Sequence, residues 1–222
     1  MNTAEVSSPG PHNVQRIVLA STSPSRLSIL RSAGVEPILI NPEVDEDTAA
    51  AELTNPTPEE FVLHLAQAKA RTAWRRRQDS GEATDGEVLI GGDSMLLIDG
   101  QLQGKPLTEE ETVRRWQQQR GKSAQLITGH CVIHQGDEFS ETALTTLHFA
   151  NATDKDILAY ARTGEPLFCA GAFTLEALGG WFIDRIEGDP SSVIGLSLPT
   201  IRRALEHFGL AFSDFWNAAP KA

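Results

Sequence analysis

Residues 17–34 read IVLASTSPSRLSILRSAG, and this stretch determines how the fold begins. Its first four residues, 17–20, are apolar and predict a buried strand. Ser23 suits the N-cap of a helix and Pro24 its first turn, while Gly34 marks the end of that helix. The sequence therefore predicts a strand, a short turn rich in hydroxyl groups, and a helix that stops at Gly34.

The turn between this strand and this helix has the chemistry of a phosphate site. Backbone N–H groups at the helix N-terminus, the hydroxyls of 21–23 and the guanidinium of Arg26 would converge there. Many strand–turn–helix units of this kind bind nothing, so the interpretation depends on other motifs. Those motifs are an acidic run at 43–47, GGDS at 91–94 inside an apolar strand, and GKP at 104–106.

Length and composition restrict the class of protein. The chain has 222 residues, of which 40% are hydrophobic and 22% charged, and its formal net charge is −11. This length suits one large α/β domain or two small lobes, and the negative charge argues against a general nucleic-acid binder. The charge does not exclude a nucleotide substrate, because a local cluster of Lys and Arg can bind phosphate on an acidic protein.

The chain ends and the cysteines carry expectations about organisation and environment. Residues 1–13 predict a flexible tail, 14–212 a single α/β domain, and 213–222 a C-terminal tail. No apolar run is long enough to cross a membrane and the first residues do not read as a signal peptide, so we expect a cytoplasmic protein. Cys131 and Cys169 form neither a metal-ligand spacing nor a disulfide framework and are expected to be reduced thiols.

Helix and strand signals alternate irregularly along the rest of the chain. Thr57 and Glu60 form a capping box, and 88–98 reads as a central strand that ends at a hairpin signal, 99–100. The other expected elements are strands near 35–41, 124–134, 139–149 and 180–186, helices near 108–121, 153–164 and 199–208, and loops at 43–47 and 188–197. This order predicts an α/β fold with a mixed sheet flanked by helices, not a pure Rossmann fold.

Asp93 is the candidate catalytic residue with the clearest local signal. A carboxylate inside a buried strand needs a partner or a ligand, and Gly91 and Gly92 would leave room for a ligand near the backbone. A strand bulge whose aspartate caps a neighbouring turn is the other interpretation, and the sequence alone leaves both open. Glu46 could join Asp93 in binding Mg²⁺, with phosphate oxygens completing the coordination, although most acidic runs are simply solvated.

Two lysines could bind phosphate groups. Lys105 follows the hairpin in GQLQGKP at 100–106, which is one residue short of a P-loop and lacks its Ser or Thr, so we reject the P-loop interpretation. A lysine there could still reach a phosphate as a point charge. Lys69 lies on the apolar side of its helix with Phe61 and Leu65. It is therefore either a snorkelling lysine or a phosphate ligand with a packed stem and an ammonium group in a cleft.

The histidines and Cys169 receive no functional role from the sequence. His130 and His134 would share one face of a strand, as a metal pair could, but no carboxylate or cysteine completes a ligand set. Cys169 has no base partner that the sequence can identify, so nucleophilic catalysis is not expected of it.

Together the motifs resemble those of the Maf family of nucleoside triphosphate pyrophosphatases, over roughly 16–209. The family's LASxSPRR appears as LASTSPSR at 19–26, its LAxxKA as LAQAKA at 65–70, and its DT as DS at 93–94. Its DE, GKP, AG and VxGLPL appear at 45–46, at 104–106, at 170–171 and, as VIGLSL, at 193–198. Each motif is short, and it is their order and spacing that are specific to the family.

The resemblance implies a mixed α/β fold similar to that of inosine-triphosphate pyrophosphatases. Two lobes would enclose a cleft that takes a nucleoside triphosphate and Mg²⁺ or Mn²⁺. Water would attack the α-phosphorus and give a nucleoside monophosphate and pyrophosphate. The expected partners are the nucleotide and, in a homodimer, a second copy of the chain, with neither nucleic acid nor membrane among them.

The resemblance also implies roles for individual residues. Asp93 would accept the proton of the attacking water, and Glu46 and Asp93 would hold the metal ion. The catalytic Lys69 and Lys105 would neutralise charge on the phosphates. Ser21, Ser23 and Arg26 would bind the substrate, with Arg26 also neutralising phosphate charge.

Three positions set this chain apart from the family members that act on dTTP, UTP and CTP. Ser25 replaces an arginine, Ser94 a threonine, and Glu176 a glutamine. The segment CAGAFTLEALG at 169–179 resembles instead the branch that acts on 7-methyl-GTP, although that branch tends to carry an aromatic residue at position 25. A glutamate can accept hydrogen bonds from the N1–H and N2–H₂ edge of guanine, and aromatic stacking would favour a cationic methylated base.

Two other functions stay open at this point. The family's association with septum formation, and Cys169 where the family has a lysine, would suit a nucleotide-binding regulator of cell division with weak or no catalysis. The presence of Asp93, Glu46, Lys69 and Lys105 favours an enzyme. A house-cleaning enzyme for deaminated purines is the second alternative.

Overall fold

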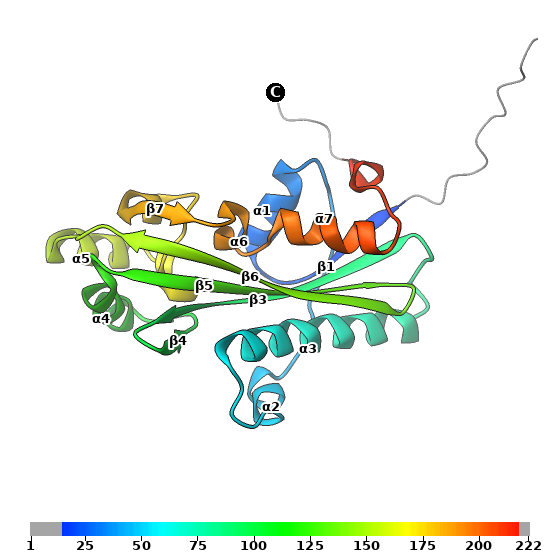
Figure 1. Ribbon diagram of the computed structural model, residues 1–222, viewed down its shortest axis with the longest axis horizontal. Helices are drawn as coiled ribbons and strands as arrows, with labels where there is room; N and C mark the ends of the chain where they lie inside the picture. Colours follow the sequence, from blue (N-terminus) through cyan, green and yellow to red (C-terminus); the bar gives the residue numbers. More distant parts are fainter. Residues whose placement is uncertain (1–14, 218–222) are drawn as a thin grey trace, which may run out of the picture.

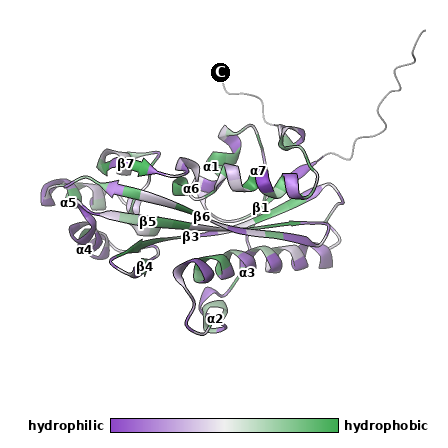
Figure 2. Cartoon of the chain, in the orientation of Figure 1, coloured by the Kyte–Doolittle hydropathy of each residue, from purple (hydrophilic) through white to green (hydrophobic). Residues whose placement is uncertain are grey.

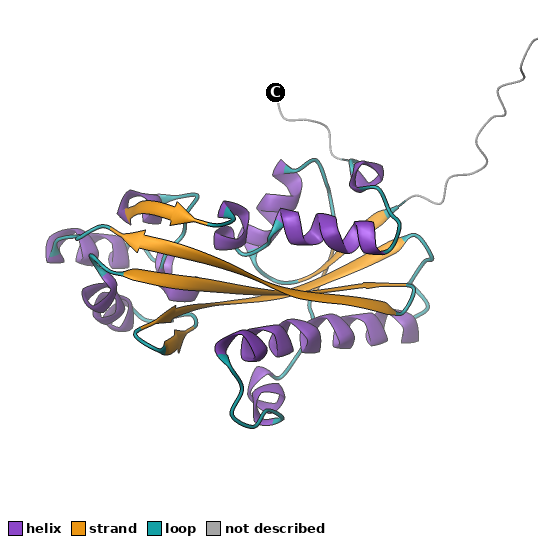
Figure 3. Cartoon of the chain, viewed as in Figure 1, coloured by secondary structure: helices purple, strands orange, loops and turns teal. Residues whose placement is uncertain are grey.

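A mixed sheet forms the centre of the fold. The computed structural model describes residues 15–217, so the tail expected at 1–13 lies outside the described residues. The described chain forms a seven-stranded sheet of order β2-β1-β3-β5-β6-β7, with β4 paired to β3 (Figures 1 and 3). The strands are β1 (Arg16–Ala20), β2 (Ile38–Ile40), β3 (Glu87–Ile98), β4 (Gln101–Gln103), β5 (Ser123–His134), β6 (Asp137–Phe149) and β7 (Ile183–Glu187). β2, β1 and β3 are parallel, whereas β3, β5, β6 and β7 pair antiparallel, which confirms the mixed sheet.

Helices cover both faces of this sheet. In Figure 1, α3 lies along one face, while α1, α6 and α7 lie on the other, and α4 and α5 sit at one end. Their bounds are α1 (Pro24–Ser32), α2 (Glu46–Ala51), α3 (Pro58–Asp79), α4 (Glu109–Gln119), α5 (Asp154–Arg162), α6 (Pro190–Ile194) and α7 (Leu198–His207). Four 3₁₀ helices are also described: η1 (Glu165–Phe168), η2 (Ala170–Ala172), η3 (Leu178–Phe182) and η4 (Phe212–Phe215). In the part of the chain that the structure describes, no helix combines the length and the apolar composition needed to span a membrane.

Side-chain caps begin α1, α3, α4 and α5, including the caps expected from the sequence at Ser23 and Thr57. Ser23, Thr108 and Thr153 each accept a backbone N–H in the first turn of α1, α4 and α5. In α3 the capping box is complete, since Thr57 N donates to Glu60 Oε2 at 2.8 Å and Glu60 N donates to Thr57 Oγ1 at 3.2 Å. Local hydrogen-bonding chemistry therefore fixes where these helices start.

The long strands pass through three clusters of buried hydrophobic residues, two near the start of β3 and one near its end. Near the start of β3, Val88 and Ile90 face a core beneath α1 and α7, while Leu89 faces a core beneath α3. Near its end, Leu96 and Ile98 belong to another core around Trp116 of α4. Figure 2 shows β3 and β5 as mostly hydrophobic, as strands buried on both faces should be. The polar residues midway along β3 therefore lie between two lobes with separate sets of buried hydrophobic residues.

The glycines before Asp93 serve packing rather than an open approach to the backbone. A Cβ at Gly91 would lie 2.8 Å from the Cβ of Ala70, so that glycine lets α3 rest directly on the strand. A Cβ at Gly92 would lie 3.5 Å from Nε of Arg26, a side chain of this protein. The register of β3 with β5 also runs without interruption past Asp93, which excludes the strand bulge.

Some expected boundaries were wrong, for local reasons. Asp45 caps the short helix α2 inside the expected acidic loop, and Asp189 caps α6 inside the loop expected at 188–197. The strand expected at 180–186 begins only at Ile183, after η3. At the other end, Phe215 in η4 is 1% exposed in the core beneath α7, so the packed chain continues beyond the tail boundary expected after residue 212.

Candidate active site

One large cavity contains every residue that the sequence singled out for chemistry. It has a volume of about 930 Å³ and opens between the two lobes. Its wall includes the turn that precedes α1, the helices α2 and α3, and the middle of β3. The loop that follows β4 and the segment 165–176 complete this part of the wall. The predicted site residues on that wall are Ser21, Ser23, Ser25, Arg26, Glu46, Lys69, Asp93, Ser94, Lys105 and Glu176.

The ammonium group of Lys69 joins two carboxylates in this cavity. Its Nζ lies 2.6 Å from Oδ1 of Asp93 and 2.8 Å from Oε1 of Glu46. Lys69 comes from the buried face of α3, next to Leu65 and Ala66, and Asp93 comes from the middle of β3. Lys69 is therefore a packed stem with its charged end in the cleft, rather than a lysine that reaches solvent.

The second oxygen of Asp93 has free acceptor capacity. Oδ2 is buried and receives no hydrogen bond from the described residues. A buried carboxylate oxygen without a donor is costly unless a ligand, a metal ion or a water completes it. The donor set of Asp93 and Glu46 fits Mg²⁺ or Mn²⁺, because Mg²⁺ is usually held by one or two carboxylates together with substrate phosphates and water. Among the described residues, no group of three or more His, Cys, Asp or Glu side chains could hold a metal by itself.

Glu46 is held in its ionised form by the cations around it. Burial alone would raise its pKa, but the hydrogen bond and charge of Lys69, with the charges of Lys105 and Arg26, lower that pKa below its usual value. Because the three cations all act on one carboxylate, they lie close enough to act on a single polyanionic ligand.

Arg26 is a buried cation with fixed protein partners. Its Nε donates to the carbonyl of Gly195 at 2.7 Å, Nη1 to Oγ of Ser21 at 3.3 Å, and Nη2 to Oγ of Ser94 at 3.2 Å. Burial lowers the pKa of this guanidinium, and the charges of Asp93 and Glu46 oppose the effect. The arginine of the opening motif is thus oriented by Ser21 in the turn before α1 and by two distant residues, Ser94 and Gly195.

Ser94 lies in a chain of hydrogen bonds behind Arg26. Its Oγ is 3.0 Å from Oγ1 of Thr128, which in turn donates to the carbonyl of Ser192 at 2.9 Å. Since the Thr128 proton is used there, Ser94 donates to Thr128 and accepts from Arg26. The hydroxyl of Ser94 is therefore committed to protein partners and connects Arg26 with β5 and α6.

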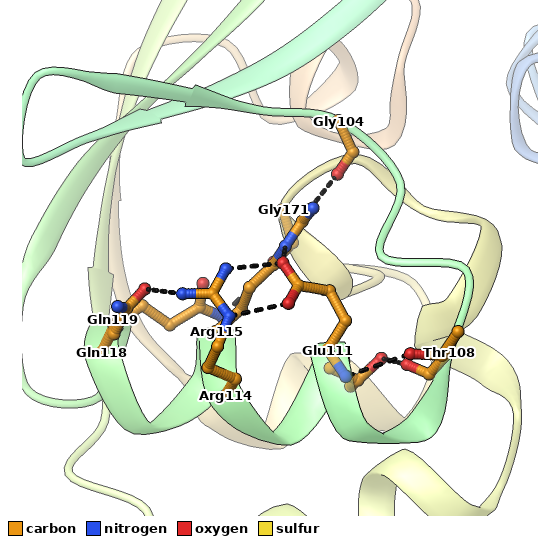
Figure 4. A network of polar contacts seen from close by, with 9 residues as sticks. Gly104, Thr108, Glu111, Arg114, Arg115, Gln118, Gln119 and Gly171 are labelled. Atoms are coloured by element: carbon orange, nitrogen blue, oxygen red, sulfur yellow. Dashed lines mark hydrogen bonds and ion pairs between the residues drawn. The ribbon is translucent and has the colours of Figure 1, made fainter.

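A network on α4 positions the loop that carries Lys105 (Figure 4). The carbonyl of Gly104 accepts from Nη1 of Arg115 at 2.6 Å and from the backbone N–H of Gly171 at 3.2 Å. Arg115 is held in turn by Glu111, whose Oε1 lies 2.7 Å from its Nε. This contact could not be predicted from the sequence, because Arg115 and Gly104 are brought together only by the tertiary fold.

Glu111 should make stability depend on pH. Its hydrogen bonds to Arg114 and Arg115 lower its pKa from 4.5 to about 2. A carboxylate whose pKa is lower in the folded than in the unfolded protein stabilises the fold at every pH above its unfolded-state pKa. This stabilisation is lost as the pH falls from about 4.5 toward 2. We expect Glu111→Gln to lower the melting temperature at pH 7, with a difference from wild type that narrows steadily below pH 4.5.

The exposed neighbour Glu110 supplies the control for this prediction. Glu110→Gln should leave the melting temperature nearly unchanged at both ends of the pH range. If the melting temperatures of Glu111→Gln and wild type differ by the same amount at pH 7 and at pH 3, the pH-dependent role of Glu111 is contradicted.

The part of the cavity wall supplied by the segment 165–176 has a different character. It is formed by Glu165, Phe168, Cys169, Ala170, Phe173, Thr174 and Glu176. Burial, followed by the charges of Glu176 and Glu165, raises the pKa of the Cys169 thiol to about 11. A thiol with that pKa is protonated at neutral pH, which agrees with the absence of a nucleophilic role.

The histidines do not form a metal pair. Nε2 of His130 accepts the backbone N–H of Ser197 at 2.8 Å, and burial lowers the pKa of this histidine to about 4, so it stays neutral at pH 7. His134 Nδ1 lies 2.9 Å from the carbonyl of Glu87. His130 thus helps fix Ser197, the N-cap of α7, which is a structural contact that sequence spacing could not reveal.

Comparisons with known proteins agree with this arrangement. The family model of Maf-like proteins matches residues 16–208. The nucleoside triphosphate pyrophosphatases of Corynebacterium efficiens and Corynebacterium diphtheriae are each 62% identical over 201 residues, covering 90% of this chain and 98% of the relative. The nucleoside triphosphate pyrophosphatase of Nocardia farcinica is 48% identical over 206 residues, covering 90% and 96%. With these matches over nearly its whole described length, the chain belongs to the Maf family.

Proposed function

We propose that this protein hydrolyses a nucleoside triphosphate to the monophosphate and pyrophosphate, with Asp93 as the proton acceptor for the attacking water. The observation that carries the proposal is the group of Lys69, Asp93 and Glu46 inside a cavity that also holds Arg26 and Lys105. Relatives that share 62% of the aligned residues are nucleoside triphosphate pyrophosphatases, which supports the same reaction here.

In this proposal the cationic end of the cavity binds the phosphates. A triphosphate carries several negative charges, and Arg26, Lys69 and Lys105 supply positive charge from three different elements. Ser21 and Ser23 stand at the N-terminus of α1, where backbone N–H groups and the helix dipole favour an anion. Binding of the phosphates would give Lys69 a second set of partners besides the two carboxylates.

Asp93 suits the role of general base in position and in chemistry. One oxygen is occupied by Lys69, while Oδ2 is free to accept a proton from water. Glu46 and Asp93 would hold a divalent cation, which supplies charge neutralisation on the phosphates and polarises them. General-base help of this kind contributes roughly 10²- to 10⁴-fold to the rate.

A panel of nucleotides tests the proposal. Wild-type protein would be mixed with Mg²⁺ or Mn²⁺ and with GTP, 7-methyl-GTP, ITP, UTP, dTTP and CTP, and the release of pyrophosphate measured. We expect turnover of at least one nucleotide, with nucleoside monophosphate formed in equal amount. Nucleotide binding without turnover in every case would instead favour the regulator of cell division.

For the preferred base we propose a purine, 7-methylguanine, whose edge would be recognised by Glu176. This residue lines the cavity within the segment 165–176, and its carboxylate can only accept hydrogen bonds when ionised. The N1–H and N2–H₂ groups of guanine are matching donors, whereas uracil and thymine offer fewer. Ser25 and Ser94, the other two positions that separate the family's branches, border the cavity nearer the phosphates.

Glu176→Gln should cost activity on guanine nucleotides by about 1–3 kcal/mol of transition-state binding, the scale of one charged hydrogen bond. UTP and dTTP should lose less, or gain. The measurement is kcat/KM for 7-methyl-GTP, GTP, UTP and dTTP with both proteins. An equal change for all four substrates, or a wild type that prefers UTP and dTTP, would contradict the assignment.

A further inference from the structure

We propose that Phe168 is the platform on which the nucleotide base stacks, an inference that rests on the function proposed above. Phe168 ends η1 and borders the cavity. Its ring would stack on the face of the base, whereas Glu176 would accept hydrogen bonds from the polar edge of the base.

The exposure of Phe168 is the first observation behind this inference. The residue is 69% exposed, although a phenylalanine side chain normally buries most of its surface. Among the large hydrophobic side chains that are exposed in the described part of the chain, Phe168 alone borders the large cavity. An exposed aromatic ring at the wall of a ligand cavity has its face available for a planar partner.

The distribution of charge fixes which part of the nucleotide meets this ring. The cations Arg26, Lys69 and Lys105 all act on Glu46, so the phosphates belong in the part of the cavity around Glu46 and Asp93. A nucleotide with its phosphates there extends its base toward 165–176, where Phe168 lies. Base–aromatic stacking accepts every base, since each has a π face, while a cationic methylated base gains further attraction to the ring.

The backbone around Phe168 is held in place, as a platform requires. The carbonyl of Leu167 accepts a hydrogen bond from the N–H of Leu107 at 2.9 Å. The N–H of Cys169 donates to the carbonyl of Pro166 at 3.2 Å. The same stretch is therefore tied to the loop of Lys105, two residues before Leu107. The backbone that carries Phe168 and the backbone that carries Lys105, the proposed phosphate ligand, are therefore held next to each other.

Glu165 anchors the other side of η1. Its carboxylate accepts hydrogen bonds from the Tyr160 hydroxyl at 3.1 Å, from the hydroxyl of Thr174, and from the backbone N–H groups of Leu178 and Gly179 at 3.2 and 3.0 Å. Burial would raise the pKa of Glu165, but these hydrogen bonds outweigh it and lower that pKa. The ionised carboxylate thus connects the segment of Phe168 with the segment of Glu176.

Substitutions at Phe168 test the inference by steady-state kinetics. Phe168→Ala and Phe168→Leu should raise KM by about 10-fold for purine and pyrimidine triphosphates alike, with kcat changed less, whereas Phe168→Tyr should resemble wild type. Inhibition by pyrophosphate, which lacks a base, should be unchanged in all of them. The matched control is Trp181→Ala, because Trp181 is 84% exposed but lies outside this cavity.

Two kinetic outcomes would overturn the inference. If Phe168→Ala keeps the wild-type KM, or behaves like Trp181→Ala, the ring does not contact the base. If Phe168→Leu has the wild-type KM while Phe168→Ala does not, the position needs apolar volume and not an aromatic face.

A binding titration separates this inference from the proposed reaction. In Phe168→Trp, GMP and UMP should quench fluorescence beyond the change seen with wild type, and pyrophosphate should not. Extra quenching would support the platform even if the wild type released no pyrophosphate from any nucleotide, a result that would defeat only the proposed reaction. No additional quenching by either monophosphate would overturn the platform.

Discussion

Asp93→Asn is expected to lower kcat by about 10²-fold or more while the fold stays intact. Asparagine has the same shape and can still accept the hydrogen bond that Lys69 donates to Oδ1 at 2.6 Å. What it loses is the negative charge and the basic oxygen at Oδ2, which receives no hydrogen bond from the described residues. Rates on the preferred nucleotide and the melting temperature would be measured together.

Asp99→Asn is the matched control for this substitution. Asp99 lies in the hairpin after the same strand, is exposed, and has φ of 50°, a backbone conformation that asparagine tolerates. It should keep wild-type rates. Near wild-type turnover by Asp93→Asn, with the fold shown to be unchanged, would mean that another group accepts the proton.

Lys69→Met is expected to reduce both stability and activity. Without the ammonium group, the carboxylates of Asp93 and Glu46 face each other with no cation between them, and Asp93 is buried. Removal of one partner from a buried ion pair costs about 3 kcal/mol of unfolding free energy. Denaturant unfolding at pH 7 with EDTA measures this cost, because added divalent cations would mask it.

Lys122→Met provides the comparison for Lys69→Met. Lys122 also makes a 2.6 Å ion pair, with Asp99, but both partners are largely exposed. An exposed pair is worth about 0–1 kcal/mol, so this variant should remain close to wild type in stability and rate. Equal losses of stability for the two variants would show that the cluster in the cavity has no special cost.

The sequence predicted those parts of the fold that depend on neighbouring residues. Thr57 and Glu60 are three residues apart, so their capping box is visible in the chain, and the apolar run at 88–98 marks a strand buried on both faces. Asp45 and Asp189 also cap helices, but α2 and α6 are too short to leave a periodic pattern. The tertiary contacts of Phe215 could not be seen in the sequence.

Sequence motifs likewise identified the wall of the cavity but not the partners of its residues. The family motifs brought attention to Arg26, Lys69 and Asp93, which do line one cavity. Nothing in the sequence indicated that Arg26 would bind the carbonyl of Gly195, since that contact spans 169 positions. The interpretation of Gly91 as space for a ligand was wrong for the same reason, because the residue that fills this space comes from α3.

Hydrolysis in ¹⁸O-labelled water tests the central claim most directly. The protein would be incubated with Mg²⁺ and its preferred nucleotide in this solvent, and the products analysed by mass spectrometry. Attack on the α-phosphorus predicts one labelled oxygen in the nucleoside monophosphate and none in the pyrophosphate, with Asp93→Asn forming neither product at a comparable rate. Label in the pyrophosphate, or formation of a nucleoside diphosphate and phosphate, would contradict the account.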